Sequence, residues 1–507
     1  MLENNYFNLF LGVPDTDLAK IIEEVQEAGK NHPEIYEKLD RDIDEKALEK
    51  KRIRYLNKQY KNRKASFLSD DLEAKSTMEH NPWILGVGCP RISSEEVFLF
   101  LTLEGYWGSV TDKRSVEAMR ESTSLYIYYS NLNKKMPKPK TIQENLRYIK
   151  AETLEYIHQC QLHDFLNEGL DDFNYITLDS TSVQASSSWP TDATIIYKLL
   201  FRAYTQSQKL SVFGLDNIRP WYVPDWLKKL KKLLFEINNT KGSSNCPKAQ
   251  KIKKPYRLFL NAAHNMYQYL IREFEGRSVK VATADLEPGK KTQLQTLWNK
   301  IEDDLLALSP VLYYAEDRVF CDVKLPSVEK ILSISDTTAA FIKKGQRNPV
   351  IGYKPQIGMS RNGFVTGIIL DKGNVPDSRY LFPLVKRHKE STGIIPEFVS
   401  TDDGYSSIKG RNECLAFGVK DVCFSGAVGK GILGEEIWED SKYIAGRRDR
   451  SAVESLMFTL KYVFYFGRMR RVGIKAVQKE MLAKIIAYNY RHKILRLRRE
   501  MKFLKGG

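Results

Sequence analysis

The sequence lacks the cysteine and histidine groupings of a zinc site or a disulfide framework. Its six cysteines are dispersed and contain no CxxC pair, which argues against zinc ribbons and indicates a reducing compartment. The seven histidines are dispersed as well. His158 and His163 are too far apart in register to share one face of a helix. A metal site built on sulfur or imidazole is therefore not expected.

Long apolar runs are also missing. No stretch reaches the ~18 apolar residues of a membrane span, and MLENNYFNLFLGVPDTD at the N-terminus has no basic region before its short apolar run, so no secretory signal is expected. The glycine-rich stretch at 426–434, GAVGKGILG, lacks the full GxxxxGK[ST] spacing and is interpreted as a flexible loop rather than a nucleotide site. We therefore expect a cytoplasmic protein without a membrane partner or a nucleotide cofactor.

The sequence has fewer acidic than basic residues. The chain carries 79 Lys and Arg against 63 Asp and Glu, a net charge of +16. Such a field attracts polyanions, of which nucleic acid is the commonest large one. Residues 45–64 hold nine of these cations and two glutamates, and they predict either a solvated basic helix or a clamp on a DNA backbone.

Local patterns divide the chain into helical and mixed regions. Capping boxes at Ser93–Glu96 and Thr141–Glu144 predict helices on either side of the basic, proline-containing linker 134–140. FNYITLDSTSVQA (173–185) alternates like a strand that ends near Asp179. Helical periodicity then fills 190–325.

From residue 330 the pattern returns to strands. Strands are expected at 349–358, 363–370, 396–400 and 421–426, with helices at 378–391 and 404–416 and a long helix from about 449. With the helical stretch set aside, this order is an α/β unit that carries an insertion after its first strand.

The expected domain map has five parts. They are a basic N-terminal arm (1–70), a helical DNA-binding region (71–170), a discontinuous α/β catalytic core (171–189 and 330–480), a mainly helical insertion (190–329) and a basic C-terminal helix (481–507).

Carboxylates stand at the strand ends of this core. Asp179 ends the first strand, and Asp402 and Asp403 end the strand before the 404–416 helix, while Glu454 lies early in the last helix. The carboxyl ends of strands in an α/β layer face one crevice, and carboxylates gathered there need a cation among them. Oxygen ligands favour Mg²⁺ or Mn²⁺. Asp336 is an alternative acidic ligand, although it lies before the second strand.

The expected last helix combines a carboxylate with cations. At about 100° per residue, Glu454 falls on the same face as three basic residues: Arg450, Lys461 and Arg468. The face suits either plain i,i+4 ion pairs in solvent or a carboxylate on metal whose basic neighbours hold DNA phosphates.

Three stretches together resemble the DDE transposases of bacterial insertion sequences. ITLDST (176–181) is similar to the strand of the family's first aspartate, STDDGYSS (400–407) to its Asp-x-Gly-Tyr motif, and RSAVESLMFTLKYVFYFGRMR (450–470) to its glutamate helix. Residues 343–367, 485–494 and 137–157 also resemble the family. The tyrosine expected before Arg450 is replaced by Arg447, which departs from the strictest subgroup. The arrangement is most similar to the ISNCY type.

The resemblance implies an RNase H-like catalytic core with two Mg²⁺ (or Mn²⁺) ions. Asp179, Asp402 and Glu454 would be the catalytic metal ligands, because the first aspartate of Asp-x-Gly-Tyr is the family's ligand. Asp403 would then be a helix cap or an outer acceptor. The DNA contacts implied are Arg450, Lys461, Arg468, Arg447 and Arg448.

Three functions are compatible with this reading. The first is a transposase, bacterial and nucleoid-associated, that cleaves transposon-end DNA and joins the 3′-OH to target DNA as a homodimer assembled on DNA. The second is a metal-dependent nuclease on the same core without strand transfer. The third is an inactive DNA-binding transposase relic, against which the presence of all three carboxylates argues.

Overall fold

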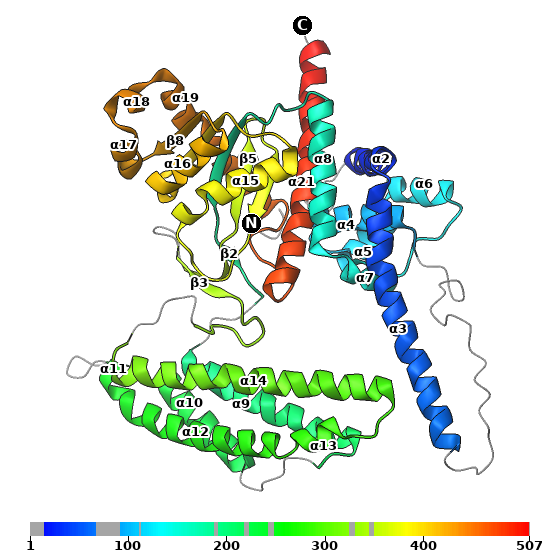
Figure 1. Cartoon of the computed structure of the whole chain (residues 1–507), viewed down its shortest axis with the longest axis vertical. Helices are drawn as coiled ribbons and strands as arrows, with labels where there is room; N and C mark the ends of the chain where they lie inside the picture. Colours follow the sequence, from blue (N-terminus) through cyan, green and yellow to red (C-terminus); the bar gives the residue numbers. More distant parts are fainter. Residues whose placement is uncertain are drawn as a thin grey trace. The chain divides into compact units, whose positions relative to one another are not determined.

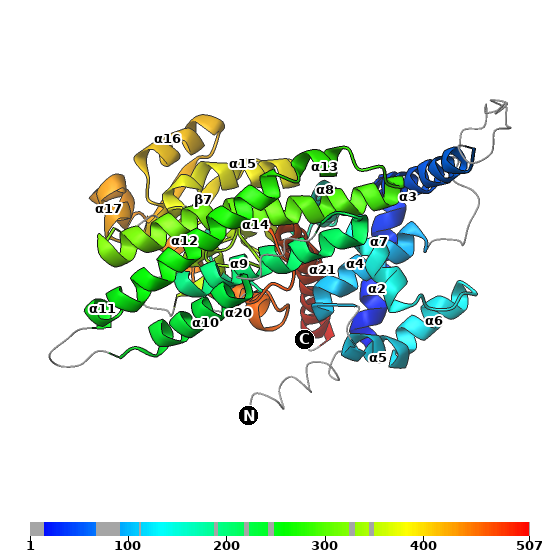
Figure 2. The same cartoon turned by 90° about the horizontal axis from the view of Figure 1, so that it is seen from below.

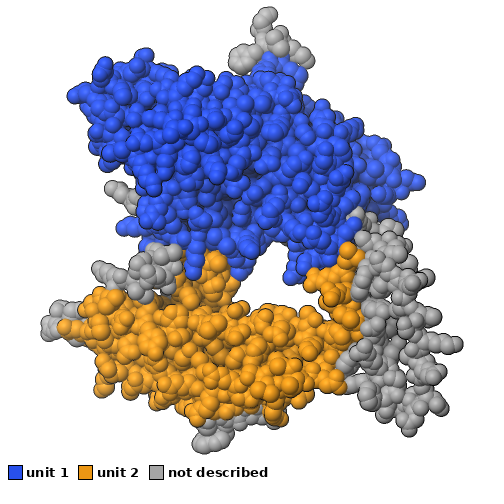
Figure 3. Space-filling view, viewed as in Figure 1, with its two compact units in different colours: residues 1–46, 88–186, 341–507 blue, residues 47–87, 187–340 orange. Residues whose placement is uncertain are grey.

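The structure is a computed structural model that describes residues 15–66, 92–110, 113–186, 191–216, 223–241, 248–323, 330–343 and 349–505. Parts of the predicted arm, of the 71–170 region and of the family-like segment 343–367 lie outside these residues, as do most side chains of the basic segment 45–64. The chain divides into two compact units (Figure 3): unit 1 comprises 1–46, 88–186 and 341–507, and unit 2 comprises 47–87 and 187–340.

Unit 1 is built on a five-stranded mixed sheet in the order β6-β5-β1-β7-β8. β1 (Tyr175–Ser180) is antiparallel to β5 (Gln356–Ser360), which is antiparallel to β6 (Val365–Ile369). On its other side β1 runs parallel to β7 (Phe398–Asp402), and β7 runs parallel to β8 (Asp421–Ser425). A mixed sheet with flanking helices confirms the expected α/β core. A smaller sheet, β2-β4-β3, contains Val183–Gln184, Val350–Tyr353 and Ala340–Ile342.

Helices cover the central strands on both faces, which is why β1 and β5 are almost entirely buried. On one face α15 (Leu381–Thr392) buries Leu381, Leu384 and Val385 in the same core as Ile176 and Leu178 of β1. α8 (Ala151–Asn167) packs beside α15 and against the 32-residue helix α21 (Ile474–Lys505), as Figure 1 shows. The predicted helix at 378–391 is confirmed by α15.

The N-terminal part of unit 1 is helical. Its elements are α2 (Asp15–Asn31), the first part of α3 (Glu34–Ser66), α4 (Ser94–Trp107), α5 (Lys113–Glu121), α6 (Thr123–Asn131) and α7 (Pro139–Tyr148). The Ser93–Glu96 capping box is confirmed, with both reciprocal hydrogen bonds present. The predicted capping box at Thr141–Glu144 is wrong, because both residues lie inside α7, whose N-cap is Lys138. α7 begins at Pro139 because proline at a first helical position needs no N–H partner.

The predicted long helix from residue 449 is wrong. The chain forms α19 (Ser441–Asp449), α20 (Ala452–Tyr462) and α21, with Tyr465 in the left-handed region at φ 55°. The helix stops because the next segment pairs with β2. Gln184 N donates to Gly467 O at 2.9 Å, and Met469 N donates to Gln184 O at 2.8 Å. Figure 2 shows α20 and α21 as separate helices.

Two further elements differ from the expectations. The helix expected at 404–416 begins later, as α16 (Ile408–Phe417), after a short turn η4 (Asp403–Tyr405). The stretch expected as a flexible loop at 426–434 is a short helix, α17 (Ala427–Leu433), followed by α18 (Glu435–Glu439). Residues 377–379 form a second short turn, η3 (Asp377–Arg379).

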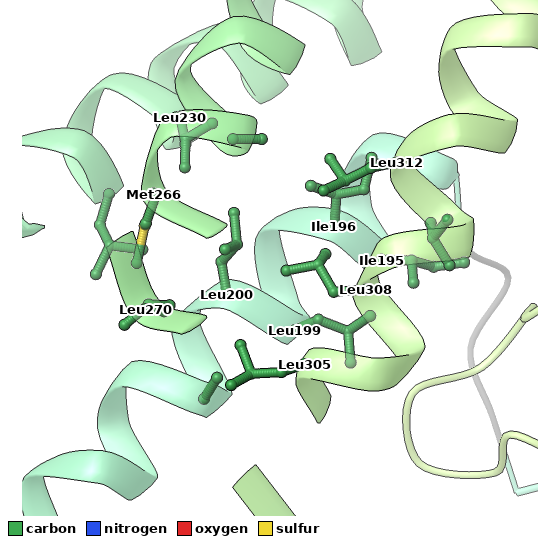
Figure 4. Packing of buried hydrophobic residues seen from close by; sticks show 14 of the residues in the cluster. Ile195, Ile196, Leu199, Leu200, Leu230, Met266, Leu270, Leu305, Leu308 and Leu312 are labelled. Atoms are coloured by element: carbon green, nitrogen blue, oxygen red, sulfur yellow. The ribbon is translucent and has the colours of Figure 1, made fainter. Parts of the chain in front are cut away.

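Unit 2 is helical in the residues that are described between 191 and 323. Its helices are α9 (Asp192–Ser207), η1 (Gln208–Phe213), α10 (Val223–Asn239), α11 (Lys248–Lys251), α12 (Lys253–Glu275), α13 (Ser278–Ala282) and α14 (Pro288–Phe320). Apolar stripes at helical spacing, such as Ile196–Leu199–Leu200 of α9, interlock with Leu305, Leu308 and Leu312 of α14 (Figure 4). Among all described residues, no helix is long and apolar enough to cross a membrane.

Candidate active site

Asp179 and Asp402 lie side by side at the carboxyl ends of two neighbouring parallel strands. Leu178 of β1 is in register with Thr401 of β7, so the next residues, Asp179 and Asp402, are level with each other. Neighbouring strands are about 4.8 Å apart, and residues in register project to the same face. Asp179 is 7% exposed and accepts a hydrogen bond from Ser180 N at 2.7 Å, whereas Asp402 is half-buried and accepts from Gly404 N at 3.0 Å.

The face that carries both aspartates is covered by α19 and α20. Tyr175 and Phe398, which precede the aspartates on this face, stack at 5.0 Å. The Tyr175 and Ser400 hydroxyls donate to the carbonyl of Gly446 in α19. Met359, which pairs with Thr177, lines a cavity together with residues of α20, and α20 contacts β1. The helix that bears Glu454 therefore lies over the aspartate face.

A third aspartate, which the sequence patterns did not single out, joins this site. Asp377 of η3 accepts from the Ser180 hydroxyl at 3.1 Å and from Gln356 Nε2 at 2.7 Å, and it forms an ion pair with Lys354 at 2.8 Å. A Cβ built on Gly404 would lie 3.1 Å from Asp402 Oδ1 and 3.3 Å from Asp377 Oδ2. The carboxylates of Asp377 and Asp402 thus flank the same glycine.

Tyr405 connects these groups. Its side chain is fully buried, and its hydroxyl donates to Gln356 Oε1, whose amide nitrogen holds Asp377. Burial, and then the charges of Asp377, Asp179 and Asp402, raise the pKa of the Tyr405 hydroxyl well above its usual value. The neutral phenol is therefore a hydrogen-bond donor, and the three aspartates create a strongly negative potential around it.

Asp403, the neighbour of Asp402, turns away from this group. Its carboxylate accepts from the backbone N–H groups of Gly429 at 2.8 Å and Val428 at 3.2 Å, and from the Ser406 hydroxyl at 3.0 Å. It occupies the N-terminal end of α17, where negative charge is favoured. A Cβ on Gly426, whose φ is 134°, would come 2.4 Å from Asp403 Cγ, so glycine is needed there.

Glu454 is exposed on the first turn of α20, where its backbone N–H donates to Ser451 O at 3.1 Å, and its carboxylate makes no hydrogen bond or ion pair with any described residue. Lys461 lies in the last turn of the same helix. Arg450 is the C-terminal cap of α19, and Arg468 lies beyond α20 in the segment that pairs with β2. The single helical face expected for these four residues is therefore wrong, because the helix is interrupted on both sides of 452–462.

The two remaining basic candidates differ in environment. Arg447 is half-buried, and its guanidinium lies 3.9 Å from the centre of the Trp438 ring. Burial raises the pKa of the Cys423 thiol, and the charge and hydrogen bond of Arg447 offset part of this rise. Arg448 is exposed beside Asp449. Asp336, the alternative acidic ligand, is buried in unit 2 and accepts from Thr338 N and Oγ at 3.2 and 2.7 Å.

The donor chemistry of Asp179 and Asp402 suits a hard divalent cation. Both offer carboxylate oxygens, and Lys354, which lies in the same group, is already paired with Asp377. Among the residues described, no three His, Cys, Asp or Glu side chains are grouped as a formed metal centre. The two aspartates are brought together by the sheet, while Glu454 lies on the exposed side of α20, a helix that contacts β1.

Lys354, Gln356 and Asp377 were missed because they carry no ligand motif of their own. Lys354 and Gln356 stand in KPQ within the single strand expected at 349–358, which the structure divides into β4 and β5, and Asp377 follows a Gly-Asn turn signal. The available signal was position: Gln356 begins β5, the strand paired with the Asp179 strand, so its side chain lies at the aspartate end.

Comparison with known proteins gives one match. Residues 335–490 match the family model of the transposase DDE domain. No curated protein and no solved structure shows a significant similarity to the chain. The matched part contains Asp402 and Glu454, and the sheet places Asp179, which lies outside the matched part, beside Asp402. The segment 335–490 is thus similar to the DDE domain of transposases, and this similarity supports a DDE transposase.

Proposed function

We propose that this protein is a transposase that cleaves the ends of an insertion sequence and joins the freed 3′-OH to target DNA. The observation that carries the proposal is the level placement of Asp179 and Asp402 on adjacent parallel strands, within a chain whose residues 335–490 match a transposase DDE domain. The sheet order, with two antiparallel strands on one side of β1 and two parallel strands on the other, supports an RNase H-like core.

Asp179, Asp402 and Glu454 are the proposed ligands of two Mg²⁺ or Mn²⁺ ions. When bound, such ions stabilise the attacking and leaving oxygens of an in-line phosphoryl transfer. The chain itself contributes position. Ser180 N and Gly404 N hold one carboxylate oxygen of each aspartate, and the Tyr405–Gln356–Asp377–Lys354 group ties β5, η3 and η4 beneath them.

DNA is proposed to bind through phosphates. The net charge of +16 supplies long-range attraction, and Arg448, Arg450, Lys461 and Arg468 lie on or beside the helices above the aspartates. Arg447 is proposed with them, although its guanidinium already stacks on Trp438. The helical region around α4 to α7 is the proposed additional DNA-binding part, and a homodimer on DNA is the proposed assembly.

The experiment is a pair of assays on the full chain with a duplex that carries the element's end. Asp179→Ala, Asp402→Ala and Glu454→Ala are each expected to reduce Mg²⁺-dependent cleavage to background while duplex binding persists, because the ligands serve chemistry rather than docking. A strand-joining assay separates transposition from a nuclease that only cuts. Cleavage that survives all three substitutions would refute the proposed site.

A further inference from the structure

A cavity of about 360 Å³ lies in unit 1 between α20, α21 and the turn that joins β5 to β6. Arg361, Arg491 and Arg499 line it together with the polar side chains of Asn362, Ser455 and Thr459. The lining, which consists of described residues throughout, contains no Asp or Glu. We call this cavity the arginine pocket. Arg361 already pairs with Asp449, so Arg491 and Arg499 are the two guanidinium groups whose mutual repulsion an anion in this space would relieve.

Arg491 supplies a hydrogen-bond donor without an acceptor. Its guanidinium carbon lies 6.0 Å from the centre of the Tyr106 ring and 5.9 Å from that of Phe464, so aromatic rings flank it. Its Nε is buried, and no described atom accepts a hydrogen bond from it. A buried donor that lacks a partner destabilises the fold, and more so when it is charged. An anion in the pocket would remove that destabilisation.

The other two arginines, Arg361 and Arg499, lie on the solvent-exposed side of the pocket. Arg361 is 65% exposed and pairs with Asp449 at 3.3 Å, and Arg499 is exposed. His492, also in the lining, donates from Nε2 to the Asn362 carbonyl at 2.7 Å. Burial first, and then the charges of Arg496 and Arg499, lower the pKa of His492. The pocket therefore has a positive potential that a phosphate can reach.

We infer that the arginine pocket binds a backbone phosphate of the DNA that the protein cleaves, with Arg491 and Arg499 as donors and Ser455 as a polar neighbour. The inference rests on the proposed function. DNA is favoured as the source because Ser455 directly follows Glu454 on α20, so a strand that meets Glu454 passes the pocket. Planar guanidinium groups match the paired oxygens of a phosphodiester.

The test uses the full chain and a duplex of generic sequence, with affinity measured by fluorescence anisotropy over a series of NaCl concentrations. Arg499→Gln should weaken binding and reduce the slope of log affinity against log salt by about 0.9. Ser455→Asp, which places a negative charge on the pocket wall, should weaken binding further. Lys420→Gln is the control, because Lys420 is exposed at the opposite strand end and pairs only with Glu397 among the described residues.

Circular dichroism spectra should show all variants folded. Both Arg499 and Ser455 are exposed, so their substitution does not disturb the core. If wild-type protein shows the steep salt slope and both pocket variants share it, the pocket inference is overturned while the proposed function stands. If the wild type itself shows no salt-dependent binding, the proposed function fails first.

A spectroscopic measurement distinguishes a DNA phosphate from any small anion. An anion beside His492 should raise the pKa of its imidazole, which NMR can follow after the signal is assigned with His492→Gln. We expect the rise on adding duplex at concentrations where inorganic phosphate has no effect. A rise with inorganic phosphate and none with duplex would overturn the assignment to DNA.

Discussion

Two adjacent aspartates take opposite roles because a strand ends between them. Asp402 is the last residue of β7 and stays in the plane of the sheet beside Asp179. Asp403 begins η4, where the backbone turns and directs its carboxylate to the N–H groups of Val428 and Gly429. One residue thus lies beside Asp179 in the candidate site, and the next holds the end of α17.

Asp403→Ala should lower the free energy of unfolding and leave DNA cleavage intact. The variant loses the acceptor for two backbone N–H groups, and loss of a cap costs about 1 kcal/mol. We expect the midpoint of urea unfolding to fall and Mg²⁺-dependent cleavage to persist. Asp402→Ala should show the reverse pattern. Loss of cleavage in Asp403→Ala with full cleavage in Asp402→Ala would mean that the assignment is shifted by one residue.

Lys354 is expected to stabilise the site through Asp377. Both side chains are 11% exposed, and removal of one partner of a largely buried pair leaves an uncompensated charge that costs about 3 kcal/mol. Lys354→Met should therefore lower the free energy of unfolding by more than Lys354→Met combined with Asp377→Asn does. Lys420→Met, which breaks an exposed pair with Glu397, should cost less than about 1 kcal/mol. Equal losses for the single and double variants would contradict the coupling.

Among the elements, α20 presents a mixed surface. Its buried side, Val453, Leu456, Met457 and Leu460, packs inward, while Glu454 is exposed near one end and Lys461 is half-buried near the other. Phe458 and Tyr462 are exposed between and beyond them, with their rings 4.6 Å apart. Because α20 is a separate short helix, the direction of these side chains is set by α20 alone and does not follow the helical period of α19 or α21.

Lys461→Ala separates the two roles proposed for this helix. If Lys461 holds a phosphate, the substitution should reduce the salt slope of DNA binding by about one unit and slow cleavage without abolishing it. Glu454→Ala should leave the slope unchanged and remove cleavage. If Lys461 serves only the helix, its loss should change the melting temperature slightly and leave both the affinity and the slope unaltered. Affinity and thermal unfolding measured on the same preparation decide the question.

At the scale of the whole molecule, unit 1 is held together by contacts between distant parts of the chain, and two buried histidines mark them. His388 of α15 bonds to Thr366 Oγ1 at 2.8 Å and to Phe173 O at 3.0 Å. His158 of α8 bonds to Val365 O at 2.8 Å. Burial is the main cause that lowers the pKa of both imidazoles from 6.5 to about 4.

These histidines should make unit 1 sensitive to acid. Between pH 6.5 and about 4 the unfolded chain binds a proton at each histidine and the folded chain does not, so their stabilisation is complete above pH 6.5 and falls as the pH decreases. At pH 5 each should have lost about 2 kcal/mol. Urea unfolding of wild type and His388→Gln at pH 7 and pH 5 tests this. The free energy of unfolding of the variant should be lower than that of the wild type at pH 7 and should change less between pH 7 and pH 5. An equal change with pH in both proteins would contradict the role assigned to His388.

Much of the core was accessible from local pattern. Alternation of apolar residues placed the strands that carry Asp179 and Asp402, since side chains of a strand repeat every two residues whatever the strand pairs with. The 3.6-residue period placed α15 and the helices of unit 2 for the same reason. The aspartates were singled out because the end of a strand is itself a local feature.

What only the tertiary structure decided depends on pairing between distant segments. The helix after Glu454 stops because Gly467 and Met469 bond to Gln184, a partner that no local period reveals. Lys354 and Asp377 meet because η3 folds back over the start of β5. Arg361, Ser455 and Arg491 converge from a turn and two helices. A sequence determines the period of each element, whereas burial and hydrogen bonding between elements determine where one ends and which side chains become neighbours.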